Sequence, residues 1–197
     1  MIRILLAFAS VLLFGACSTT SVPLTYAPGA DAPKAAAAGA RVAAVTFTDH
    51  RDEPPTYLGA IRGGFGNPLK TLESDRPVAD VVQAAFVDGL KARGVATGGA
   101  SVAGGFRLTG RVLQLDANQV ARRLATAEVE LSVVETPGNA VRLTRRYSAS
   151  RQDGELISMD TGVFASVEDL RVVMEQTLRE LVDKALDDPE LRAAMAL

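Results

Sequence analysis

Three stretches decide the fold of this chain: residues 106–112 read FRLTGRV, residues 127–133 read AEVELSV, and residues 141–147 read VRLTRRY. In each stretch, apolar or small residues largely alternate with charged or hydroxyl-bearing ones. Because successive side chains of a strand point to opposite faces, this alternation predicts strands with one buried and one solvated face. One-sided burial is typical of antiparallel pairing, so we expect a mostly antiparallel sheet. In one register of that sheet, Glu130 lies across from Arg146.

Two apolar stripes at helical spacing flank these strands. The first runs from about Pro77 to Arg93 and ends at Gly94, and the second follows a capping box formed by Ser166 and Asp169. Two long amphipathic helices can cover one face of a single sheet. The predicted fold class is therefore α+β, with both helices packed on the same face of the sheet. The stripe residues are Val78, Val81, Val82, Ala85, Phe86, Gly89 and Leu90 in the first helix, and Leu170, Val173, Met174, Thr177, Leu178, Leu181, Val182, Ala185 and Leu186 in the second.

Shorter elements precede and follow this core. Residues 41–48 predict a strand with Val45 and Phe47 facing inward, and residues 57–62 predict a second short strand. The glycine-rich residues 63–68 between that strand and the first helix predict a turn. A short last helix is expected to begin around Asp188 and Pro189.

The N-terminus has the organisation of a secretory leader. Arg3 supplies a positive charge, and residues 4–14 are apolar except for Ser10. As a helix this stretch would be about 16 Å long, at about 1.5 Å per residue, against a bilayer core of about 30 Å. It is therefore too short to span a membrane and is typical of a signal peptide.

The leader ends in Phe14-Gly15-Ala16-Cys17, which resembles the lipobox of bacterial lipoproteins. The resemblance implies that Cys17, the only cysteine, becomes the first residue of the mature chain and carries two or three acyl chains, enough for stable anchoring. Ser18, in place of an aspartate, favours the outer membrane and its periplasmic face. The lipobox usually has Leu where this chain has Phe14. Two alternatives stay open: cleavage after Ser18 to give a secreted protein, and an uncleaved leader.

The chain is predicted to have three parts. Residues 1–16 are the signal peptide, residues 17–39 are the lipidated N-terminus with a flexible tether, and residues 40–197 are one periplasmic α+β domain. The tether is predicted from its prolines, its alanine run and its small polar residues, which favour extended chain over a packed core.

Composition excludes several classes of function. The chain has 21 basic and 23 acidic residues, and removal of residues 1–16 takes away only Arg3, so the net charge falls from −2 to −3. The chain therefore lacks the excess of positive charge that is typical of nucleic-acid-binding proteins, and we expect no nucleic-acid partner. The glycine clusters match no phosphate-binding motif, and we expect no cofactor. One cysteine excludes an internal disulfide and a cysteine-rich zinc site.

The loop after the first strand of the domain is the candidate interaction loop. It contains Asp49, the only histidine, His50, and Arg51. Together with the acids at 52 and 53, Asp49 and His50 have side chains of the metal-ligating type, but consecutive loop residues rarely converge on one ion. We therefore expect no metal, no catalytic residues and no enzyme here, with a solvated loop as the plainer interpretation.

Several loose motifs resemble the YajG-like family of small bacterial envelope lipoproteins. They are the lipobox, Val45-x-Phe47-x-Asp49-x-Arg51, the helix end Leu90-x-x-Arg93-Gly94-Val95, Asp116-Ala117 after a strand, and Arg145-Arg146-Tyr147-Ser148-Ala149-Ser150. The resemblance brings no catalytic residues. It implies a periplasmic domain anchored to the outer membrane.

Two functional hypotheses follow. The first is a non-enzymatic binding or assembly module of the cell envelope, held to the membrane by its N-terminal lipid, with another envelope protein or peptidoglycan as partner. The alternative is a small-ligand carrier or an enzyme that uses the loop around Asp49 and His50.

Overall fold

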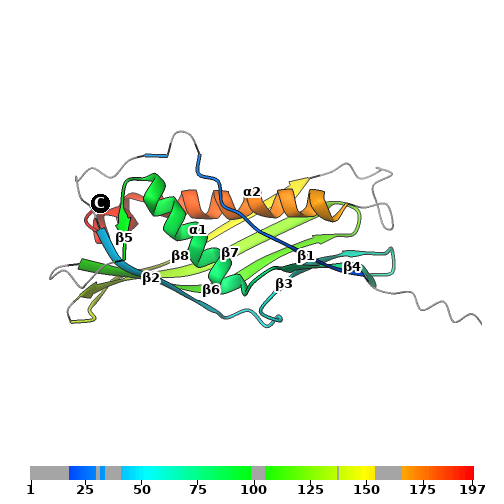
Figure 1. The fold of residues 1–197 in the computed structure, drawn as a ribbon, viewed down its shortest axis with the longest axis horizontal. Coiled ribbons are helices and arrows are strands. Elements are labelled where there is room, and N and C mark those ends of the chain that lie inside the picture. Colours follow the sequence, from blue (N-terminus) through cyan, green and yellow to red (C-terminus); the bar gives the residue numbers. More distant parts are fainter. Residues whose placement is uncertain (1–17, 30–31, 34–40, 99–104, 137, 154–165) are drawn as a thin grey trace, which may run out of the picture.

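The computed structural model describes residues 18–29, 32–33, 41–98, 105–136, 138–153 and 166–197. Within these residues, eight strands form one sheet, and helices α1 (Val78–Ala92) and α2 (Val167–Leu186) lie on one face of it (Figure 1). A short helix α3 (Pro189–Ala194) follows α2. The predicted arrangement of two long helices on one face of a sheet is therefore confirmed.

The strand order is β1-β4-β3-β6-β2-β5, with β7 paired to β6 and β8 paired to β7. Strands β2 and β3 both pair with β6, along its first and its last residues respectively, while β7 pairs along nearly its whole length. Hence β2 and β3 share one edge of β6. The strands are β1 (Ser18–Val22), β2 (Arg41–Asp49), β3 (Tyr57–Arg62), β4 (Pro68–Ser74), β5 (Ala96–Thr97), β6 (Gly105–Gln119), β7 (Arg123–Thr136) and β8 (Val141–Asp153).

The prediction of a mostly antiparallel sheet is wrong. Four of the seven pairings among the described strands are parallel: β1 with β4, β2 with β5, β2 with β6 and β3 with β6. The three stretches that predicted antiparallel strands do pair that way, as β6, β7 and β8, with Glu130 opposite Arg146. Three of the four parallel pairings join a strand before α1 to a strand after it, so the chain crosses over through that helix; β1 and β4 both precede α1. Both long helices lie on one face of the sheet (Figure 1), and the other face carries polar side chains such as Arg111, Glu130 and Arg146.

The core lies between the sheet and the two helices. All the predicted stripe residues of α1 and α2 are buried. Phe47 of β2 packs on Phe86 of α1, with ring centroids 5.0 Å apart. The Phe47 ring lies directly against Gly110 of β6, where an added Cβ would come within 2.1 Å of it. The sheet and α1 are thus held together at a point that has room only for glycine.

The helix boundaries follow local signals. The Ser166 hydroxyl accepts a hydrogen bond from the Asp169 backbone N–H, as the capping box predicts. Gly94 follows the C-cap of α1 with a φ of +79°, a conformation that favours glycine.

The N-terminal segment is part of the fold from its first described residue. Residues 17–39 were expected to be a flexible tether, but Ser18–Val22 form β1, which pairs with β4. Val22 and Leu24 are buried in the core, and the Thr25 backbone N–H and hydroxyl both donate to the Glu175 carboxylate of α2. Val22 and Leu24 pack into the core, although most residues of this segment are small or polar. Residues 1–16 and Cys17 lie outside the described residues.

A buried arginine joins this segment to both long helices. The Arg93 side chain, at the end of α1, is only 2% exposed and pairs with Asp183 at 3.0 Å and Asp187 at 2.6 Å. The Tyr26 hydroxyl donates to Asp183 at 2.7 Å. Burial, together with this hydrogen bond, raises the pKa of Tyr26 to about 12. The network fixes the course of the N-terminal segment over the helices.

Candidate functional site

The candidate site lies where β2 and β3 separate along their shared edge of β6. Strand β2 pairs with β6 up to Val112, and β3 pairs with it from Ala117 onward. The loop from residue 50 to residue 56 leaves the sheet at this point. Its first residue still follows the ladder, because the His50 backbone N–H donates to the Val112 carbonyl at 2.9 Å. We call this separation of β2 and β3 the fork. It leaves a short piece of β6, between Val112 and Ala117, without a strand neighbour on this edge among the described residues.

Arg51 fills that fork. Its guanidinium donates to the Leu115 carbonyl of β6 at 3.1 Å and to the Tyr57 carbonyl of β3 at 2.7 Å. Further bonds reach the carbonyls of Pro54 and Pro55 at 3.3 and 3.4 Å. The side chain is only 4% exposed. Arg51 therefore replaces the donors that a neighbouring strand would supply to this part of the sheet.

Asp49 holds Arg51 in place. Its two carboxylate oxygens accept from Nε and Nη2 of Arg51, both at 2.9 Å, in a bidentate pair. Burial alone would raise the pKa of Asp49, but the hydrogen bonds and charge of Arg51 outweigh it and lower the pKa. Both residues of this pair are thus engaged with each other and with the backbone.

His50 points elsewhere. Its Nδ1 lies 3.3 Å from Nη2 of Arg111, an exposed arginine of β6. Arg111 also pairs with Glu130 of β7 at 3.0 Å, and Glu130 pairs with Arg146 of β8 at 3.0 Å. The structure therefore separates the three residues of the predicted interaction loop: Asp49 and Arg51 support the fork, and His50 joins the charged outer face of the sheet.

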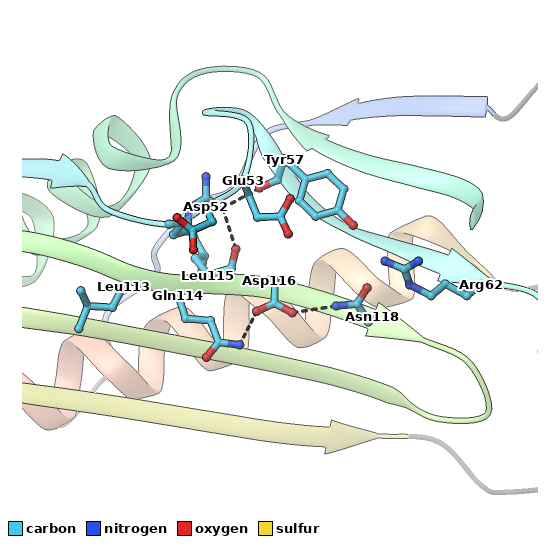
Figure 2. A pocket seen from close by; sticks show the side chains of 10 residues that line it. Asp52, Glu53, Tyr57, Arg62, Leu113, Gln114, Leu115, Asp116 and Asn118 are labelled. Carbon is cyan, nitrogen blue, oxygen red and sulfur yellow. Dashed lines mark hydrogen bonds between the residues drawn. The ribbon is translucent and has the colours of Figure 1, made fainter. Parts of the chain in front are cut away.

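A cavity of about 290 Å³ opens beside the fork, between the 50–56 loop and β6 (Figure 2). Its floor carries Asp116, whose two carboxylate oxygens accept from Gln114 at 2.7 Å and from Asn118 at 2.8 Å. Figure 2 shows Glu53 and Tyr57 on the loop side of these β6 residues. The lining residues are Arg51, Asp52, Glu53, Tyr57, Arg62, Leu113, Gln114, Leu115, Asp116 and Asn118.

The cavity is rich in hydrogen-bond acceptors. Asp52, Glu53 and Asp116 contribute carboxylates. The Oδ1 of Asn118 is buried and has no hydrogen-bond partner within the described residues. Of the two arginines in the lining, Arg51 is committed to the fork and Arg62 donates to the Gly66 carbonyl at 3.2 Å. The arrangement fits a ligand that presents donors such as ammonium, amide N–H or hydroxyl groups.

Gln114, Asp116 and Asn118 were not among the residues predicted to form a site. Their spacing of two does indicate one face of a strand, and three amide or carboxylate side chains in a row were the available signal. What the sequence could not show is that the strand edge beside them is open. Among the described residues, no group of three or more His, Cys, Asp or Glu side chains is arranged to hold a metal ion.

The signature of a protein family covers most of the chain. The family Lipoprotein_16, described as "Uncharacterized lipoprotein", matches residues 28–196. The chain belongs to this family. The motif resemblance predicted a bacterial lipoprotein family, and this part of the prediction is confirmed. Membership of such a family suggests a membrane-anchored place in the cell envelope. No curated protein sequence matches the lipoprotein.

Solved structures resemble the lipoprotein in fold. A protein from Xanthomonas campestris has a TM-score of 0.58 at 11% identity, covering 86% of this chain and 92% of its own. An uncharacterized protein has a TM-score of 0.55 at 8% identity, covering 85% and 95%. At such low identity these likenesses show a shared fold alone. In the part of the lipoprotein that the structure describes, no helix has the length and apolar character to cross a membrane.

Proposed function

We propose that this chain is a lipid-anchored protein of the bacterial outer membrane, attached through Cys17 and facing the periplasm. The observation that carries the proposal is the lipobox-like Phe14-Gly15-Ala16-Cys17 in a chain that belongs to a lipoprotein family. Two or three acyl chains on one residue anchor a protein stably, whereas a single chain binds only marginally. Within the family we further propose kinship with the YajG-like proteins, on the motifs quoted above.

The domain acts as a non-enzymatic binding or assembly module. Its binding site is the acceptor-rich cavity beside the fork, and its partner is another envelope protein or peptidoglycan. The carboxylates of Glu53 and Asp116 support this reading, because they face a cavity that the sheet itself leaves open. A partner group with ammonium or amide donors can approach the Asp116 carboxylate, which Gln114 and Asn118 hold in place at 2.7 and 2.8 Å.

Site-specific photo-crosslinking in living cells tests the binding site. A photoreactive residue at position 53 should give one dominant crosslinked species, and the same residue at Asp80, an exposed acid on α1, should not. Asp116→Asn should weaken the crosslink at position 53, because it removes the charge on the cavity floor. Equal crosslinking at positions 53 and 80, or none at either, would contradict the assignment of the site.

The alternative, a ligand carrier or enzyme centred on Asp49 and His50, has less support from the geometry. Both Asp49 oxygens are bound by Arg51, and His50 lies against Arg111 instead of Asp49. His50→Ala separates the two hypotheses, since it changes the outer face without touching the fork. A deletion-like phenotype in a folded His50→Ala protein would favour the alternative.

A further inference from the structure

The N-terminal strand starts at one end of the sheet, beside a hairpin. Strand β1 pairs in parallel with β4, and its first residue, Ser18, lies opposite Lys70. Strand β4 begins at Pro68, directly after the β3–β4 turn at residues 63–67. Figure 1 shows β1, β3 and β4 together at the end of the sheet away from the C-terminus. Successive Cα atoms are about 3.8 Å apart, so an anchor on Cys17 must attach at this same end.

The same end carries exposed apolar side chains. Phe65, in the β3–β4 turn, is fully exposed. The β6–β7 turn lies next to it, because Ile61 of β3 is level with Gln119, the last residue of β6. Val120 and Leu124, in and after that turn, are 49% and 47% exposed. Three of the five large apolar side chains that are exposed among the described residues therefore lie at the end where the chain emerges.

Basic residues lie beside these side chains. The β3–β4 hairpin over residues 61–70 and the β6–β7 turn over residues 119–124 contain four basic residues and no acidic one, and of these four Arg123 is buried and paired with Asp169 at 2.7 Å and Asp153 at 3.9 Å. Basic groups next to a bilayer are attracted by anionic headgroups. Exposed apolar tips framed by cations are a typical combination in protein surfaces that lie on lipid. The four basic residues are Arg62, Lys70, Arg122 and Arg123.

We propose that this end of the sheet docks on the bilayer that holds the lipid anchor, with Phe65 inserted at the boundary between headgroups and acyl chains. The inference rests on the proposed lipidation of Cys17. Because β1 begins at Ser18, no spacer separates the anchor from the domain, and the domain stands on the membrane in one orientation. The acceptor-rich cavity, which is lined partly by Arg62 of the same hairpin, then lies close to the lipid surface.

The chain contains no tryptophan, which makes a direct test simple. Phe65→Trp places a single fluorophore at the membrane-facing tip. Val141→Trp is the matched control, because Val141 is 61% exposed and lies at the opposite end of the sheet, where it pairs with Val134 near the end of β7. Both lipidated variants are reconstituted in vesicles of phosphatidylethanolamine and phosphatidylglycerol, with and without brominated acyl chains.

The Phe65→Trp emission should shift to the blue on reconstitution and be quenched several-fold more by brominated lipid than the Val141→Trp emission. Equal quenching at the two positions, or water-like emission from Phe65→Trp in protein that floats with the vesicles, would overturn the docking proposal. A blue shift that grows with protein concentration in detergent, without lipid quenching, would also overturn it and indicate contact between copies. Failure of the protein to float would instead contradict the lipid anchor, so the two failures are distinguishable.

Discussion

Replacement of Arg51 by methionine should destabilise the domain more than any other loss of a single ion pair near the loop. The change removes the donors to two strand carbonyls, Leu115 and Tyr57, and leaves the Asp49 carboxylate without its partner. Breaking a buried pair from one side costs about 3–5 kcal/mol. Asp49 is 20% exposed, so water can resolvate part of its charge. We therefore expect about 3 kcal/mol, at the lower end of that range.

Urea denaturation followed by circular dichroism measures this loss. The midpoint should fall while the slope of the free energy of unfolding with urea stays that of the native protein. His50→Ala is the matched control on the same loop and should change the free energy by less than about 1 kcal/mol, since His50 is exposed. The double variant Asp49→Asn with Arg51→Met should recover part of the loss, because no unpaired carboxylate is left. A loss below about 1 kcal/mol in Arg51→Met would refute the role of Arg51 at the fork.

Three further outcomes are expected from urea titrations. Gly110→Ala should destabilise the domain by about 1–3 kcal/mol, because its Cβ would meet the Phe47 ring at 2.1 Å; a neutral effect would contradict the close packing of β6 on β2. The pKa of Asp49 is lower in the folded protein than in the unfolded chain, where it is about 3.9, so the ionised carboxylate stabilises the fold above that value. This stability is lost as pH falls through the folded pKa. Asp49→Asn should therefore flatten the dependence of the free energy of unfolding on pH below about pH 4. The raised pKa of Tyr26 contributes stability that is fully present below about pH 10 and is lost as pH rises toward the folded value of about 12. Tyr26→Phe should therefore lose less stability than the native protein over that range, and an unchanged alkaline profile would contradict the buried hydrogen bond to Asp183.

Local patterns predicted the elements whose burial is one-sided and regular. Every stripe residue of the two long helices is buried, and the Glu130–Arg146 pair lies in the predicted register, at 3.0 Å. The local sequence is enough to predict these elements, because their apolar residues repeat with the period of the helix or strand. The capping box at Ser166 was visible for the same reason.

Long-range pairing was not visible in the sequence. Strand β4 contains only one buried large apolar residue, Leu72, and β1 reads STTSV, so neither shows an alternating apolar pattern. Their extended form depends on each other and on β3. The parallel pairings could not be predicted from the sequence either. An alternating pattern indicates which side of a strand is buried, but it does not indicate whether the neighbouring strand runs parallel or antiparallel.

The candidate site was found only in part. Asp49, His50 and Arg51 were predicted as an interaction loop. In the structure, Asp49 and Arg51 instead stabilise the backbone at the fork. Asp116 and Asn118 line the cavity because β3 leaves β6 beside them, a consequence of strand order that no local pattern encodes.

Acyl labelling of Cys17 tests most directly whether this residue carries the membrane anchor of the lipoprotein. Cells that produce the native chain or Cys17→Ser are grown with labelled palmitate, and the protein is recovered from separated membrane and soluble fractions. We expect the native protein to be labelled, to be recovered with the outer membrane, and to accumulate in an unprocessed form in the presence of globomycin. Cys17→Ser should carry no label. Native protein that is processed normally but remains unlabelled and soluble would show that Cys17 does not carry a lipid anchor.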